Sequence, residues 1–198
     1  SFMCFVDGKN VYPLEMAQDH KRAYDNDMGP NTGGMGAYSP LPFITKEDYE
    51  YALNKIMIPV SEAMVKEGVP FKGVLYGGLM KTKSGIKVIE FNCRFGDPET
   101  EVVLPRLTSD IYDAFMAIIE GNKPVLSWEK CYTIGIVLAS KGYPGSYQKG
   151  YVINNANDEH IYHMGTKIDD NGNLVTNGGR VLFVVGKGDT LEEANKKA

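Results

Sequence analysis

The segment IKVIEFNCRFGDPET, residues 86–100, carries residue types that could bind a divalent cation. Its first part is predicted to be a strand, in which successive side chains point to opposite faces of a sheet. Glu90, Asn92 and Arg94 should therefore share one face, and Cys93 should lie on the opposite, core-facing side. A carboxylate and an amide oxygen two residues apart suit a hard, oxygen-seeking cation such as Mg²⁺. Glu90 and Asn92 are thus the candidate metal ligands.

The residues that follow could contact a phosphorylated substrate. Arg94 could clamp phosphate oxygens and neutralise the charge that develops during phosphoryl transfer. Asp97 and Glu99 add further oxygens in the next turn. The alternative is an exposed strand face whose charges meet only solvent, where an ion pair contributes at most about 1 kcal/mol. Ile86 and Val88, which precede the polar residues, favour the lining of a cavity instead.

A second candidate site lies in the glycine-rich segment GPNTGGMGAYSP, residues 29–40. Closely spaced glycines could point their backbone N–H groups into one concavity that holds an anion. The segment lacks the Lys-Ser/Thr ending of a nucleotide phosphate loop and the strand-to-helix context of a dinucleotide fingerprint. A flexible turn is the alternative interpretation. The candidate residues for a phosphorylated substrate are Gly33, Gly34 and Gly36, together with the preceding His20 and Lys21.

The elements that must position these residues follow from local patterns. Residues 2–14 predict a hairpin around Asp7-Gly8, whereas residues 17–42 show little periodicity and predict a long irregular segment. Apolar spacing predicts a helix over residues 45–66, with an irregularity near Pro59. Two antiparallel strands, at residues 71–82 and 86–94, and a helix over residues 109–121 complete this half.

The pattern changes after residue 122. Short strand-like runs such as TIGIVLAS and RVLFVVG alternate with turn clusters such as DDNGN, which indicates a small, mostly β domain. We therefore expect an α+β chain with two domains, residues 1–122 and residues 123–198.

Composition excludes some classes of function. The 198 residues are 43% hydrophobic with a formal net charge of −4, and no apolar run approaches the ~18 residues of a membrane helix. The acidic balance disfavours a nucleic-acid-binding role. Three widely spaced cysteines without a C-x-x-C motif predict a reducing, cytoplasmic setting. The first residue is not methionine and the last residues stop within a helical pattern, so we expect a piece of a longer protein.

Three segments together resemble the phosphoribosylamine–glycine ligase family: QDHKRAYDNDMGPNTGGMGAYSP, FKGVLYGGLM and VIEFNCRFGDPETEVVLPRL. The resemblance covers essentially the whole chain, with the motifs in the same order. It implies the second half of an ATP-grasp core, an antiparallel sheet with helices, followed by the small C-terminal domain of the family. The missing N-terminal half of the same protein would hold the nucleotide-binding lobe.

The resemblance also implies an activity, the ATP-dependent ligation of glycine to 5-phosphoribosylamine in purine biosynthesis through a glycyl phosphate. By the family motif, Glu90 and Asn92 match the ligands of Mg²⁺ or Mn²⁺, and Arg94 would contact the transferring phosphoryl group. Asp97 and Glu99 would help to hold the amine substrates. The isolated chain is expected to be inactive. The alternatives are a non-catalytic structural fragment and another ATP-grasp ligase.

Overall fold

The computed structural model describes residues 1–198 and divides them into two compact units. Unit 1 comprises Ser1–Ala17, Pro40–Gly96 and Val103–Lys130. Unit 2 comprises Gln18–Ser39, Asp97–Val102 and Cys131–Ala198. This division differs from the contiguous domains 1–122 and 123–198 predicted from the sequence, because a strand within residues 18–39 pairs with a strand of the C-terminal part.

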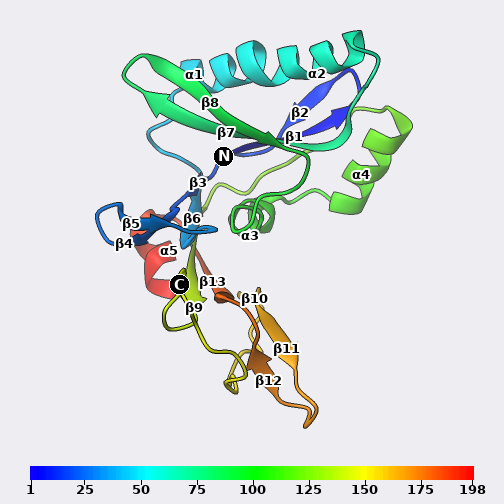
Figure 1. The fold of residues 1–198 in the computed structure, drawn as a ribbon. Helices are drawn as coiled ribbons and strands as arrows, with labels where there is room; N and C mark the ends of the chain where they lie inside the picture. Colours follow the sequence, from blue (N-terminus) through cyan, green and yellow to red (C-terminus); the bar gives the residue numbers. More distant parts are fainter. The chain divides into compact units, whose positions relative to one another are not determined.

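Unit 1 is built on a four-stranded antiparallel sheet in the order β2-β1-β7-β8. Helices α1 and α2 run along one face of this sheet, and α4 packs against β1 and β7 on the other (Figure 1). The strands are β1 (Phe2–Asp7), β2 (Val11–Pro13), β7 (Lys72–Thr82) and β8 (Gly85–Asn92). The helical elements are α1 (Lys46–Ala52), η1 (Leu53–Met57), α2 (Ile58–Lys66), η2 (Leu104–Arg106) and α4 (Ile111–Glu120).

The helix predicted over residues 45–66 forms as the continuous run α1–η1–α2. Thr45 caps its start, because the Thr45 hydroxyl accepts from the Asp48 N–H while the Asp48 carboxylate accepts from the Thr45 N–H. The irregularity expected near Pro59 takes the form of the π-helical turn η1 directly before it. Proline has no N–H to donate, so a widened turn accommodates the interrupted ladder.

The core of unit 1 lies between the sheet and the α1–α2 layer. Phe2, Cys4 and Val6 from β1 meet Ala52 and Met57 from the helices. The alternate side chains of β1 point to the opposite face of the sheet, which α4 covers. There the Phe5 ring contacts the Phe115 ring of α4 edge-on, with centroids 5.6 Å apart. Both faces of β1 are therefore buried.

The ladder between β7 and β8 contains a bulge. Leu79 pairs with Val88, whereas the preceding Gly78 pairs with Glu90, so Ile89 has no partner across the ladder. Because side chains alternate with a period of two, one extra residue exchanges the faces of every residue after it. This bulge decides where the polar end of β8 points.

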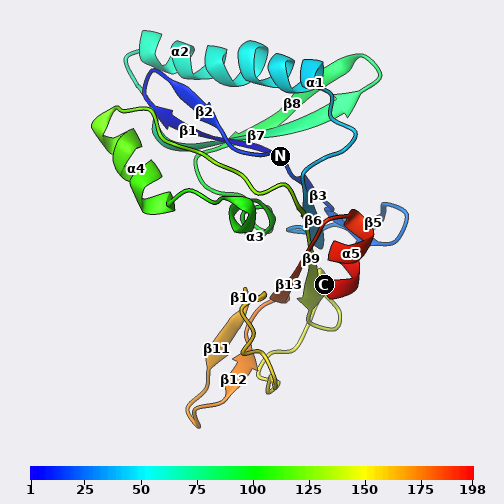
Figure 2. The same ribbon diagram turned by 180° about the vertical axis from the view of Figure 1, so that it is seen from behind.

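Unit 2 is built on a five-stranded antiparallel sheet in the order β10-β13-β9-β6-β3, and α5 packs against β9 and β13 (Figure 2). The sheet strands are β3 (Gln18–Asp19), β6 (Gly36–Ser39), β9 (Tyr132–Ala139), β10 (Ile161–His163) and β13 (Arg180–Gly188). Two hairpins complete the strands, β4 (Arg22–Tyr24) with β5 (Met28–Asn31) and β11 (Thr166–Ile168) with β12 (Leu174–Thr176). The helices are α5 (Leu191–Lys197) and α3 (Thr100–Val103), whose last residue belongs to unit 1.

Residues 17–42 were expected to lack regular structure, and this prediction is wrong. Strands β3, β4, β5 and β6 all form there. The strands are only two to four residues long, so local periodicity carries no signal for them. Strand β6, which pairs with β3, finds its other partner in β9, about a hundred residues later. None of the helices in the structure is both long and apolar enough to span a membrane.

The β6–β9 pairing generates the first prediction. Gly135 of β9 pairs with Ala37 of β6, and a Cβ at Gly135 would lie 2.0 Å from Cζ of Phe183, a fully buried ring. Gly135→Ala should lower the free energy of unfolding by roughly 1–3 kcal/mol, because the ring must shift within a packed core. Urea unfolding followed by circular dichroism measures the change. In the double variant Gly135→Ala/Phe183→Leu, the loss of unfolding free energy should be smaller than the sum of the two single losses, because the smaller side chain relieves the clash. A loss equal to that sum would contradict the clash.

Candidate functional site

The bulge places Glu90 and Asn92 on the face of the unit 1 sheet that lies away from α1 and α2. A Cβ on Gly78, the cross-strand partner of Glu90, would lie 3.0 Å from Glu90 Cγ, so these two residues share a face. Gly77 faces the other way, because its Cβ would lie 2.7 Å from Met57 Sδ. The glycine opposite Glu90 leaves its carboxylate unobstructed and exposed.

Without the extra residue at Ile89, the face of Glu90 and Asn92 would be the buried one. Ile86 belongs to the core beneath the α1–α2 layer, and Val88 pairs with a residue that packs against the same core. An unbroken alternation would send the carboxylate and the amide into that core, where an unpaired charge is costly. The predicted common face for Glu90 and Asn92 thus forms, but it is opposite to the face of the apolar residues that precede them.

Arg94 and Cys93 follow the last residue of β8. The Arg94 guanidinium is exposed and donates from Nη1 to the Phe95 carbonyl at 2.8 Å. No hydrogen bond or ion pair joins it to Glu90 or Asn92 in the structure. Cys93 is exposed, so its predicted core position is wrong. The strand ends at Asn92, and strand alternation no longer governs the residues beyond it.

In unit 2, the carboxylate of Asp19 is the centre of a charged group. Its side chain is only 3% exposed, and Oδ2 accepts from Lys21 Nζ at 3.1 Å, while Oδ1 is buried without a hydrogen-bond partner. Burial and the charge of Glu99 raise the pKa of Asp19 above its usual range, against the lowering effect of Lys21 and Arg180. Lys21 is therefore engaged with a carboxylate, whereas the sequence predicts that it contacts a phosphorylated substrate.

The anion-binding nest predicted at the glycines does not form. The Gly33 N–H donates to the Tyr143 hydroxyl at 3.0 Å, and the Gly34 N–H donates to the Thr32 hydroxyl at 3.0 Å. These donors are thus already used within the protein. Gly34 has φ +113°, and a Cβ there would lie 2.5 Å from Asp19 Oδ1, so no other residue fits at this position without strain.

His20 and Gly36 hold the adjacent backbone together. The His20 N–H donates to the Gly36 carbonyl at 2.9 Å, and the exposed His20 ring stacks on Tyr38 with centroids 5.9 Å apart. A Cβ on Gly36 would lie 2.9 Å from the Gly135 carbonyl oxygen. Gly36 therefore serves the close approach of β6 to β9, and only the His20 ring is available to a ligand.

Arg180, the first residue of β13, was not singled out from the sequence. Its Nη1 donates to the carbonyls of Gly33 at 2.8 Å and of Asp97 at 3.0 Å. The same atom lies 3.4 Å from the Asp97 carboxylate. The two glycines before it, in NGGRVLF, indicate that another part of the protein approaches the backbone closely. The hydrogen-bond partners of Arg180, however, lie more than eighty residues away along the chain. No local pattern could have identified them.

Two further carboxylates lie beside Asp97 in unit 2. Glu99 is 2% exposed, and Glu101 Oε2 is buried without a hydrogen-bond partner. Burial, together with the charges of Asp97 and Glu99, raises the pKa of Glu101 to about 7. Asp97 and Glu99 thus lie in a group that also contains Asp19, Glu101 and Arg180.

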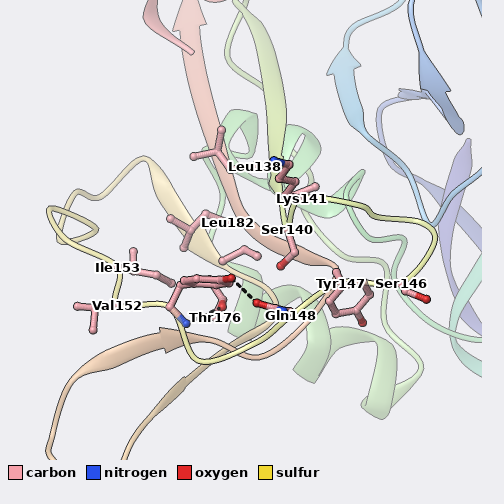
Figure 3. Close-up of a pocket in the computed structure, with 13 residues that line it drawn as sticks. Leu138, Ser140, Lys141, Ser146, Tyr147, Gln148, Val152, Ile153, Thr176 and Leu182 are labelled. Atoms are coloured by element: carbon pink, nitrogen blue, oxygen red, sulfur yellow. Dashed lines mark hydrogen bonds between the residues drawn. The ribbon is translucent and has the colours of Figure 1, made fainter.

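A pocket of about 880 Å³ opens elsewhere in unit 2, between the ends of β9 and β13 and residues 146–153 (Figure 3). Its walls include Leu138, Leu182 and Val152, and Tyr151 donates its hydroxyl proton to Gln148 Oε1 at 2.5 Å across it. None of the residues predicted from the sequence to carry chemistry lines this pocket.

Family models match both parts of the chain. The model described as "Phosphoribosylglycinamide synthetase, ATP-grasp (A) domain" matches residues 1–100, and the model described as "Phosphoribosylglycinamide synthetase, C domain" matches residues 133–198. The chain belongs to the phosphoribosylglycinamide synthetase family. The resemblance inferred from the three motifs is confirmed.

Relatives agree with this assignment. A protein named phosphoribosylamine–glycine ligase from Halalkalibacterium halodurans is 52% identical over 198 residues, which cover 98% of this chain and 46% of the relative. A protein of the same name from Vigna unguiculata is 50% identical and aligns with 100% of this chain and 67% of its own length. The chain spans about half the length of most of the curated relatives that it matches.

Solved structures confirm the α+β, ATP-grasp fold. The crystal structure of a phosphoribosylamine–glycine ligase from Thermotoga maritima superimposes with a TM-score of 0.89 at 36% identity, covering 99% of this chain and 49% of that one. A phosphoribosylaminoimidazole carboxylase ATPase subunit from Aquifex aeolicus shares the fold alone, with a TM-score of 0.57 at 16% identity over 99% of this chain and 52% of that one.

Glu101 generates the second prediction. Because its pKa is raised in the folded state, the native protein binds this proton more tightly than the unfolded chain. Stability should therefore fall as pH rises from about 4.5 to about 7 and then level off. Glu101→Gln should reduce that fall by roughly 1–2 kcal/mol, after allowance for partial solvent screening.

Urea unfolding at several pH values between 4.5 and 8 measures the difference. Glu159→Gln, which removes an exposed carboxylate of the same unit, is the matched control and should leave the pH dependence unchanged. Identical slopes for the wild type and the Glu101 variant would show that Glu101 titrates normally.

Proposed function

We propose that this chain is part of an enzyme that ligates glycine to 5-phosphoribosylamine, giving glycinamide ribonucleotide with conversion of ATP to ADP and phosphate. The observation that carries the proposal is the name shared by relatives that are 50% and 52% identical over essentially the whole chain. The exposed Glu90 and the half-buried Asn92 on one sheet face support it, because they have the ligand chemistry that such a reaction needs.

The family is an ATP-grasp family, which implies ATP with a divalent metal ion, and we propose Mg²⁺ or Mn²⁺. The residues present fit that group. Glu90 and Asn92 offer two oxygen donors on one face. No group of three or more His, Cys, Asp or Glu side chains in the structure is arranged to hold a metal ion. Mg²⁺ is commonly held by one or two protein oxygens, with substrate phosphates and water as the remaining ligands. When bound, the ion would neutralise charge on the ATP phosphates.

The proposed chemistry has two steps. The carboxylate of glycine attacks the γ-phosphorus of ATP and releases ADP, which gives a glycyl phosphate. The amine of phosphoribosylamine then attacks the activated carbonyl and displaces phosphate. Arg94, whose guanidinium is exposed at the end of β8, is proposed to contact the transferring phosphoryl group and to offset its charge.

Unit 2 is proposed to hold the amine substrates. Asp97 and Glu99 supply carboxylates for an ammonium group, and the exposed His20 ring is available to the phosphoribosyl group. Because the N–H groups of Gly33 and Gly34 are already donated within the protein, we propose that this segment shapes the site with its backbone surface and does not form a phosphate nest. Lys21 and Gly36 are proposed to support it through Asp19 and β9.

The proposal also covers the partner lobe, the domain division and the cellular location of the protein. We propose that the remaining half of the protein supplies the nucleotide-binding lobe, and that residues 1–122 and 123–198 correspond to the ATP-grasp part and the C-terminal domain. We propose a cytoplasmic enzyme that requires neither nucleic acid nor a membrane. The relative from Arabidopsis thaliana is named as chloroplastic.

The third prediction concerns the proposed metal ligand. In the full-length protein, Glu90→Gln should abolish nearly all ligase activity while the far-ultraviolet circular dichroism and the thermal midpoint stay unchanged, because the side chain is exposed and supports no core contact. Phosphate release with glycine and phosphoribosylamine measures activity. Glu62→Gln on α2, another exposed carboxylate of unit 1, is the control. Wild-type turnover by the Glu90 variant would refute the assignment.

The fourth prediction separates the ligase from a non-catalytic module and from another ATP-grasp ligase. The 198-residue chain alone should release no phosphate with any substrate and should bind ATP·Mg²⁺ only weakly in calorimetry. The full-length protein should consume ATP with glycine and phosphoribosylamine but not with bicarbonate. Micromolar binding of ATP by the isolated chain would show that its own residues suffice for the nucleotide.

A further inference from the structure

Arg180 connects three stretches of unit 2 through one nitrogen atom. Nη1 donates to the carbonyls of Gly33 at 2.8 Å, Asp97 at 3.0 Å and Gly34 at the longer distance of 3.4 Å. The Asp97 carboxylate lies 3.4 Å from the same nitrogen, and the Arg180 side chain is 19% exposed. The guanidinium thus ties the glycine-rich segment and the acidic turn to the first residue of β13.

Tyr143 binds the other backbone polar group of the same residue, Gly33. Its hydroxyl accepts from the Gly33 N–H at 3.0 Å, so both backbone polar groups of the exposed Gly33 are bonded to distant side chains. Gly179, next to Arg180, makes this possible, because a Cβ there would lie 2.1 Å from the Tyr143 ring. The two side chains therefore form one clamp, defined here as Tyr143 and Arg180, around Gly33.

The clamp restricts the backbone of the glycine-rich segment, which has few side-chain contacts of its own to restrict it. Gly33 and Gly34 have no side chains to pack, and glycine has the largest backbone freedom to lose. Hydrogen bonds from a charged donor to two adjacent carbonyls restrict that freedom more strongly than neutral bonds do. The position of Gly33–Gly34 relative to Asp97 therefore depends on residues of the C-terminal part of the chain.

We propose that Arg180, assisted by Tyr143, is a positioning residue that holds Gly33–Gly34 and Asp97 in the arrangement that binds the phosphoribosylamine substrate. The inference rests on the proposed ligase function and assigns a role to two residues outside the motifs that carry it. Arg180 does not act on the reacting atoms. It acts through the two segments to which it donates.

Arginine suits this role better than lysine would. Its planar guanidinium presents several N–H donors in a fixed geometry, whereas an ammonium is a compact charge on a flexible stem. Its positive charge also favours the ionised forms of Asp19 and Glu101. Arg180→Lys retains the charge and loses the geometry, so it separates these two contributions.

The test uses steady-state kinetics of the full-length protein with Arg180→Lys, Arg180→Gln and Tyr143→Phe. All three should raise KM for phosphoribosylamine, by about tenfold for the arginine variants, while KM for ATP changes by less than about twofold. Tyr143→Phe should have a smaller effect than Arg180→Gln, because it removes a single neutral acceptor. Two controls should change neither constant. Lys197→Gln removes a side-chain hydrogen bond to the Lys187 carbonyl of β13, and Tyr151→Phe removes the hydrogen bond to Gln148.

Amide hydrogen exchange provides a readout that does not need activity. Peptides covering residues 29–38 should exchange faster in the Arg180 and Tyr143 variants than in the wild type, while peptides from α1 and α2 should not change. Unchanged exchange, or equal increases in every KM together with a lower thermal midpoint, would overturn the proposal in favour of a merely structural role. A wild-type protein without ligase activity would instead overturn the proposed function, and the exchange experiment would still decide whether the clamp positions the segment.

Discussion

The pairing of β6 with β9 is the constraint on which unit 2 depends. It joins residues 36–39 to residues 133–136 through an antiparallel ladder, and β13 pairs with the other edge of β9. Gly34 precedes β6 by two residues, and Arg180 pairs with Ala139, the last residue of β9. The ladder thus brings the glycine-rich segment and the guanidinium to the same end of β9. The hydrogen bonds from Arg180 to the Gly33 and Asp97 carbonyls depend on that register.

In unit 1, the equivalent constraint is a single unpaired residue. Ile89 exchanges the two faces of β8 midway along the strand, so Ile86 faces the core beneath the helices while Glu90 and Asn92 face away from it. A β-bulge of this kind redirects the side chains that follow it, and such bulges are common next to functional sites. Gly78 complements it, because a side chain at that position would press on Glu90.

Much of the fold could be predicted because its signals are local. The Thr45 cap and the glycine that ends α4 both lie within a few residues of the helices they delimit. The common face of Glu90 and Asn92 was predicted because alternation holds within three residues. The face itself depends on a bulge that alternation alone does not reveal.

The remainder depends on contacts between distant parts of the chain. The short strands β3 to β6 exist only because β9 and their own hairpin partners complete them, so the sequence of residues 17–42 indicates irregular structure. The Gly33 N–H donates to Tyr143, 110 residues away, and is therefore not free for the anion that the sequence predicted. Burial of Asp19 and the raised pKa of Glu101 likewise depend on neighbours that the sequence does not place.

The interleaving of the two units has a consequence for how the chain folds during synthesis. Strand β6 leaves the ribosome about a hundred residues before β9, which at about 5–20 residues per second is a delay of roughly 5–20 s. During that time the edge of β6 that pairs with β9 has no partner, and unpaired edges promote aggregation. The charged run from Asp19 to Arg22 and the acidic Asp25 and Asp27 lie in this waiting segment. Charged side chains on and beside an edge strand oppose edge-to-edge pairing.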